Sequence, residues 1–209
     1  MPFEPAFYAA SVGEWQVRYR DWIRDPIRQQ TYRARSLLDL RPVFGQQSLW
    51  DDVDAAVVEA VDRDFVQVLA NDCMANLPPL TFFEDAVVDS VGEQQATFRL
   101  EQNALRPLVD VGRVFGLAAK TAMGRSTLER FTTARRLLPE HEAVFREAAD
   151  TLRIVLWQQG RVGISRGTNG SELPASLLSR SDRQVLKSGF RSILKLLEFA
   201  ANPVWLDEL

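Results

Sequence analysis

The stretch SDRQVLKSGFRSILKLLEFA, from Ser181 to Ala200, carries the clearest amphipathic pattern in the chain. Its apolar side chains recur every three or four positions, which places them on one face of an α-helix. They are Leu186, Phe190, Ile193, Leu194 and Leu197. A helix with one apolar face must bury that face against another element. The pattern therefore predicts a fold that is built from packed helices.

Three segments upstream of this helix show the same period. A helix is expected from about Leu105, with Leu108, Val111, Phe115 and Ala118 facing inward. A second is expected after Ser126, which has capping-box spacing to Glu129 and buries Leu128 and Phe131. A third is expected from Pro139, with the apolar stripe Phe145, Ala148, Leu152, Val155 and Leu156. Four helices with short connections predict a mainly α fold, an antiparallel bundle of four or more helices.

The N-terminal third predicts two more helical segments and a small β element. Ser11 and Glu14 form another capping box, and the apolar face Trp15, Tyr19, Trp22 and Ile23 follows it. A helical period also runs from Leu49 to about Ala75. Between these segments, residues 36–44 (SLLDLRPVF) alternate apolar and polar side chains, which predicts a strand.

Two other short segments have non-helical patterns. Residues 96–100 (ATFRL) are compatible with a second strand. Residues 160–171 (GRVGISRGTNGS) are rich in Gly, Ser and Asn, and this composition predicts a loop.

Composition limits the class of protein. The chain has 209 residues, of which 46% are hydrophobic, and its formal net charge is −3. No apolar run approaches the ~20 residues of a membrane span, and the charge argues against general nucleic-acid binding. The single Cys73 and single His141 exclude an internal disulfide and any centre that needs two imidazoles. We therefore expect a cytoplasmic globular protein with neither a membrane nor a nucleic acid as its partner.

The residues alone show no complete catalytic constellation. Asp39 and Arg41 share one face of the predicted strand, where they could hold Mg²⁺ and a phosphate or simply form a solvated ion pair. Arg113 and Arg130 could belong to a basic patch, or could be ordinary charges of helix surfaces.

The run LLDLRPVFGQQSLWDDV, from Leu37 to Val53, resembles the end of the nucleotidyltransferase domain in bacterial signal-transduction proteins related to the PII-uridylyltransferase GlnD. The remaining chain resembles the helical substrate-binding domain that follows it. The similar segments are LPPLTFF (77–83), ALRPLVDVGRVFGL (104–117), STLERF (126–131) and LPASLLSRSDRQVLKSGFRSI (173–193). The resemblance implies a nucleotidyltransferase remnant over residues 1–62 and a helical substrate-binding domain over residues 63–209.

The resemblance also implies roles for individual residues. Asp39 would be a residual catalytic carboxylate and a weak metal ligand. The implied substrate-binding residues are Arg41, Arg113, Thr127, Arg130, Gln158 and Lys187. Arg99 and Glu101 stand where the family has Asp and Lys, so the charge is reversed at both positions.

The sequence lacks the family's Gly-Ser turn and paired-Asp strand upstream of Trp15. A single carboxylate cannot organise a two-metal centre. We therefore expect Mg²⁺ only in a complete enzyme, with no cofactor for this chain alone and no catalysis by it.

Three functions remain open at this point, and one of them is a small-ligand sensor that uses the bundle interior with Arg113, Thr127 and Arg130. The first is the substrate-binding or regulatory portion of a GlnD-like nucleotidyltransferase, with a protein substrate, a nucleotide or a catalytic domain in trans as its partner. The alternative is a helical dimerisation or scaffold module without a small-molecule site. A homodimer would then pair the exposed edges of the strand predicted over residues 36–44.

Overall fold

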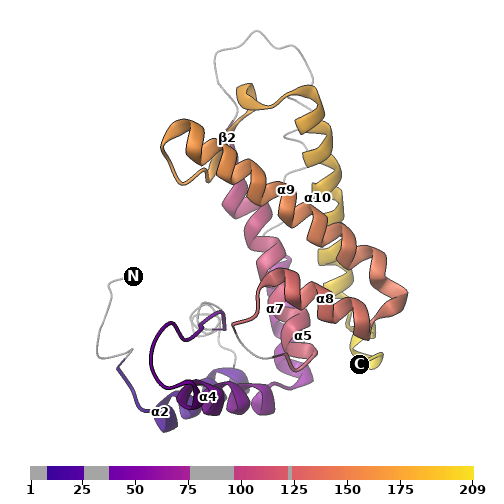
Figure 1. Cartoon of the computed structure of the whole chain (residues 1–209). Helices are drawn as coiled ribbons and strands as arrows, with labels where there is room; N and C mark the ends of the chain where they lie inside the picture. The colour runs from indigo at the N-terminus through magenta and orange to yellow at the C-terminus, as the bar shows by residue number, and fades with distance from the viewer. Residues whose placement is uncertain (1–8, 26–37, 76–96, 122–123) are drawn as a thin grey trace.

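The computed structural model describes residues 9–25, 38–75, 97–121 and 124–209 (Figure 1). Within these ranges the chain forms seven α-helices that pack against one another and one two-stranded sheet, which confirms the predicted mainly α fold. The segment 77–83, together with Ser36 and Leu37, lies outside the described residues.

The helices are α2 (Val12–Arg24), α4 (Gln47–Ala60), α5 (Arg63–Cys73), α7 (Arg106–Ala118), α8 (Thr127–Leu137), α9 (Glu142–Arg166) and α10 (Arg180–Ala201). The strands β1 (Thr97–Arg99) and β2 (Glu172–Pro174) pair antiparallel, with Phe98 opposite Leu173. Short helical turns cover Glu101–Leu105, Pro139–His141, Ala175–Leu177 and Pro203–Asp207. The strand expected within residues 96–100 is thus confirmed.

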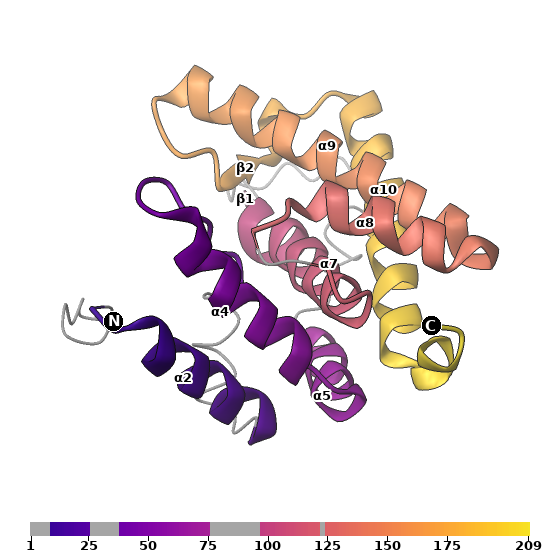
Figure 2. The same cartoon turned by 60° about the horizontal axis from the view of Figure 1, so that its bottom comes forward.

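Helix α7 lies at the centre of the group that it forms with α5, α8, α9 and α10. It contacts α5, α8 and α10, while α9 packs along α10 and against α8 (Figure 2). Helices α2 and α4 form a separate pair beside this group, and their buried side chains join the same continuous core. Aromatic rings fill its centre: Phe115 lies 4.7 Å from Phe145 and 4.5 Å from Trp205 between ring centroids.

Most of the predicted inward faces are buried. In α9, Phe145, Ala148, Leu152 and Val155 are buried, but Leu156 is 47% exposed and its assignment to the core was wrong. Leu156 directly follows Val155, and one helical residue turns the side chain by about 100° away from the buried face.

Local capping signals are confirmed by the structure. Both predicted capping boxes form, at the start of α2 and at the start of α8. The helix predicted from Leu49 to Ala75 is instead two helices, because Asp62 begins a new one. Its carboxylate accepts a hydrogen bond from the backbone N–H of Phe65 at 2.8 Å, as an N-cap does.

The strand predicted over residues 36–44 is wrong for its described part, Leu38–Phe44, which has no regular secondary structure. Leu38 is buried whereas Leu40 is 39% exposed, so the two leucines do not share a face. The carbonyl of Leu38 accepts a hydrogen bond from the guanidinium of Arg130 at 3.2 Å. A side chain from α8 thus satisfies the backbone group that a strand neighbour would otherwise satisfy.

The loop predicted over residues 160–171 is also wrong in its first half, because α9 continues to Arg166. The helix ends at Gly167, which adopts the left-handed conformation typical of a C-terminal cap. The chain then folds back tightly on the helix: a Cβ on Gly170 would lie 2.0 Å from the carbonyl oxygen of Gln159. Glycine therefore permits this return.

Candidate functional site

Two arginines from neighbouring helices converge on one carboxylate. Arg113 of α7 donates from Nε to Oδ2 of Asp39 at 2.8 Å, and its Nη2 bonds the same oxygen. Arg130 of α8 donates from Nη1 to Oδ1 of Asp39 at 2.7 Å. Both oxygens of Asp39 therefore accept charge-assisted hydrogen bonds, although the aspartate is far from both arginines in the sequence.

The helical domain fixes the two arginines through contacts of its own. Arg113 forms an ion pair with Asp110 one turn earlier on α7, and Asp110 is buried. The stem of Arg130 packs against Gly116, where an added Cβ would lie 2.9 Å from Arg130 Cγ and Cδ. Asp110 thus orients the guanidinium of Arg113 from within α7, whereas Gly116 positions only the stem of Arg130.

Thr127 lies at the same junction of α7 and α8. A Cβ on Gly112 would lie 2.7 Å from Thr127 Cγ2, so glycine allows the start of α8 to approach α7 closely. Gly112 and Gly116 are four residues apart and so share one face of α7. The structure therefore brings together four of the residues singled out in the sequence: Asp39, Arg113, Thr127 and Arg130.

The electrostatic setting keeps Asp39 ionised. Its burial disfavours the charged form, but the hydrogen bonds and charges of Arg113 and Arg130 outweigh that effect and lower the pKa of Asp39. Asp39 and Asp110 carry two negative charges against the two positive charges of the arginines. The four side chains are therefore balanced in charge.

This arrangement does not suit a divalent cation at Asp39. Both oxygens of its carboxylate face guanidinium groups, whose positive charge repels a metal ion. Among the residues that the structure describes, no group of three or more His, Cys, Asp or Glu side chains could hold a metal ion.

The other predicted substrate-binding residues lie elsewhere. Gln158 is buried between α9 and the start of α10, where it donates to Asp182 at 3.0 Å and accepts from Arg161 at 2.6 Å. Lys187 is half-buried on α10. Arg41 is exposed two residues beyond Asp39, and its Cβ lies close to Gly124.

The residues that depart from the family pattern are both exposed. Arg99 lies on β1 and donates to Gln102 at 3.2 Å, and Glu101 begins the following helical turn. The sequence reasoning did not identify Asp110 as a site residue, nor the two glycines that admit Thr127 and Arg130. The four-residue spacing of Gly112 and Gly116, which puts both glycines on one face of α7, is the signal that could have found them.

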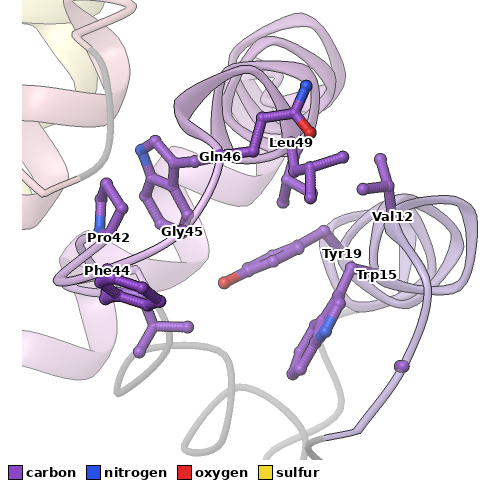
Figure 3. A pocket seen from close by; sticks show the side chains of 12 residues that line it. Val12, Trp15, Tyr19, Pro42, Phe44, Gly45, Gln46 and Leu49 are labelled. Atoms are coloured by element: carbon purple, nitrogen blue, oxygen red, sulfur yellow. The ribbon is translucent and has the colours of Figure 1, made fainter.

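An open and mainly apolar cavity of about 450 Å³ lies between α2, the irregular segment after Asp39 and the start of α4 (Figure 3). Trp15 and Tyr19 of α2 line one side of it, and Leu49 of α4 lines another. Pro42 and Phe44, from the irregular segment before α4, complete the wall. Phe44 is fully exposed, and so is most of the neighbouring Val43.

The fold and the site define a mainly α domain in which two adjacent helices present arginines to an anionic group. A family model described as "Putative nucleotidyltransferase substrate binding domain" matches residues 63–203, and the chain belongs to this family. The match begins at the expected boundary between residues 62 and 63, but the division into two domains stays a prediction.

No curated protein and no solved structure matches the chain. In the described ranges, no helix is both long enough and apolar enough to cross a membrane.

Proposed function

We propose that this chain is the substrate-binding and regulatory part of a GlnD-like nucleotidyltransferase that acts in bacterial signal transduction in the cytoplasm. One observation carries the proposal. Asp39, which the resemblance matches to a carboxylate of the catalytic domain, forms ion pairs with Arg113 and Arg130 of the family domain. This contact supports a substrate site where the two parts of the chain meet.

In this proposal, nucleotidyl transfer takes place in a catalytic core that the chain joins as a further domain or as a separate polypeptide. Mg²⁺ belongs to that core, and the partner is the core or a protein substrate. The chain alone then transfers no nucleotidyl group. Incubation with α-labelled nucleoside triphosphates and Mg²⁺ should give no labelled product, and a labelled product would contradict the non-catalytic role.

Thermal denaturation with each of the four nucleoside triphosphates, with and without Mg²⁺, tests substrate binding. A ligand that binds only the folded state adds about 2.7 kcal/mol of stability at a hundredfold excess over its Kd. We expect one nucleotide to raise the Tm and the Arg113→Met variant to lose most of that rise. Arg63→Met is the matched control, because Arg63 is an exposed arginine whose ion pair with Asp207 lies elsewhere.

A rise in Tm that survives in Arg113→Met would place the nucleotide at another site. If no nucleotide shifts the Tm of either the wild type or Asp39→Ala, the proposal that this domain binds a nucleotide is wrong.

Assembly is the second candidate function, and the apolar cavity beside Phe44 favours it. The mode expected from the sequence, pairing of strand edges, does not apply to Leu38–Phe44 because this segment is not a strand. A homodimer or scaffold contact would instead cover the cavity. Light scattering should then show association in the wild type that weakens in Phe44→Ser, whereas a monomer at all concentrations would contradict it.

A further inference from the structure

The Asp39 contact has the chemistry of a ligand in a binding site. Two guanidinium groups approach one carboxylate from two helices and donate to both of its oxygens. Planar guanidinium groups match phosphate oxygens in the same way as they match carboxylate oxygens. The pair Arg113 and Arg130 therefore offers a geometry that a phosphate group also fits.

The arginines belong to the scaffold, whereas the carboxylate comes from an irregular segment. The side chain of Arg130 is 5% exposed and that of Arg113 is 16% exposed, but that of Asp39 is 34% exposed. Asp110 and the close approach at Gly116 hold the arginines from within α7 and α8. Removal of Asp39 would leave Arg113 paired with Asp110 and the stem of Arg130 packed against Gly116, so both arginines would stay at the junction of α7 and α8.

The charge balance also favours an anion at this site when Asp39 is absent. Without Asp39, the remaining cluster of Arg113, Arg130 and Asp110 carries one net positive charge beside a surface that solvent reaches. A buried guanidinium that loses its counter-charge is destabilising, so the folded chain would gain from any anion that takes this place.

We propose that Arg113 and Arg130 form a phosphate-binding site that Asp39 occupies as a built-in carboxylate ligand. The ligand class is a phosphate-bearing anion, either the polyphosphate of a nucleotide or free pyrophosphate. Its binding displaces Asp39 and releases the segment Leu38–Arg41 from α8. Only the identification of a nucleotide as the natural ligand rests on the proposed function.

The test compares wild type with Asp39→Ala in thermal denaturation against pyrophosphate, with sodium chloride at matched ionic strength as the salt control. Asp39→Ala empties the site, so pyrophosphate should raise its Tm with an apparent affinity at least about tenfold higher than in the wild type, where Asp39 competes. Asp207→Ala is the matched control, because it removes an exposed carboxylate from its ion pair with Arg63. Its response to pyrophosphate should equal that of the wild type.

The double variant Asp39→Ala/Arg113→Met should lose the pyrophosphate response, since one of the two guanidinium groups is gone. Asp39→Asn is the second variant if Asp39→Ala does not fold, because the amide keeps the side-chain size while it removes the charge and one of the two acceptor oxygens. An equal response of wild type and both Asp39 variants to pyrophosphate would overturn the proposal, and so would a response that persists in the double variant.

These outcomes separate the inference from the proposed function. If pyrophosphate raises the Tm of Asp39→Ala and no nucleoside triphosphate raises it more than pyrophosphate does, the anion site is supported and specific nucleotide binding is contradicted. A nucleotide that stabilises the wild type and both Asp39 variants equally supports the proposed function and overturns Asp39 as its competitor.

Discussion

Substitution of Gly116 by alanine tests whether close packing of α7 against Arg130 holds the site together. Glycine inside a helix costs about 1 kcal/mol relative to alanine, so alanine should stabilise α7 if space allowed it. The added Cβ, however, would lie 2.9 Å from Cγ and Cδ of Arg130. Arg130 cannot swing away cheaply, because its guanidinium bonds Asp39 and the Leu38 carbonyl.

Gly160 provides the matched comparison on α9. It is also helical, but a Cβ there meets nothing within 4 Å. Overpacking costs typically about 1–3 kcal/mol, so after the helix gain Gly116→Ala should lose about 0–2 kcal/mol. Gly160→Ala should gain about 1 kcal/mol. The two variants should therefore differ by about 1–3 kcal/mol in their free energy of unfolding.

Urea denaturation followed by circular dichroism measures this difference under one set of conditions. In thermal unfolding, each kcal/mol corresponds to about 2–4 °C in Tm for a chain of this length. Equal or greater stability of Gly116→Ala relative to Gly160→Ala would refute the close approach of α7 to Arg130. It would also remove the argument that the scaffold fixes this arginine.

Three further predictions concern the site and its support. The pKa of Asp39 is lowered in the folded protein. Ionised Asp39 therefore stabilises the folded state, and this contribution is complete above the pKa of the unfolded chain, about 3.9. The contribution is lost as the pH falls through the lower pKa of the folded protein. The stability advantage of the wild type over Asp39→Asn, measured by urea denaturation, should therefore shrink below about pH 4, and an advantage independent of pH would contradict the ion pairs. Phe190→Ala should lose about 3–5 kcal/mol in the same assay, because Phe190 is fully buried and stacks on Phe98 at 4.8 Å; a loss below 1 kcal/mol would mean that this contact is absent. Ser126→Ala should lose about 1 kcal/mol through the capping box of α8, and Ser181→Ala, which leaves the cap at Ser179 in place, should lose less.

The helices were predictable because their signals are local. Periodic apolar residues and the Ser–Glu pairs at Ser11 and Ser126 specify helix faces and starts without reference to the rest of the chain. The break between α4 and α5 also has a local signal in Asp62, but the continuous apolar period across it favours one helix.

The segment around Asp39 was mispredicted because its conformation depends on residues far away in the chain. Alternation of Leu38 and Leu40 with polar residues is compatible with a strand, yet a strand needs a neighbour to satisfy its backbone. Arg130, more than ninety residues later, satisfies the Leu38 carbonyl instead. The same dependence explains why spacing alone left Arg113 and Arg130 as possible surface charges, whereas the structure places them beside Asp39.

In the proposed anion site, the ion pairs of Asp39 couple anion binding at Arg113 and Arg130 to the position of the segment Leu38–Arg41. An anion that binds more tightly when Asp39 is released must, by thermodynamic reciprocity, favour that release by the same factor. The strength with which Asp39 binds the arginines limits this factor. If Asp39 binds weakly, its release changes the anion affinity little, and if it binds strongly, it prevents the anion from binding. Asp39 is partly exposed beside the buried Arg130 and the partly buried Arg113, so the carboxylate neutralises the site and remains accessible to a competitor. Asp39 therefore both balances the charge of Arg113 and Arg130 in the folded chain and, in this proposal, controls anion binding to them.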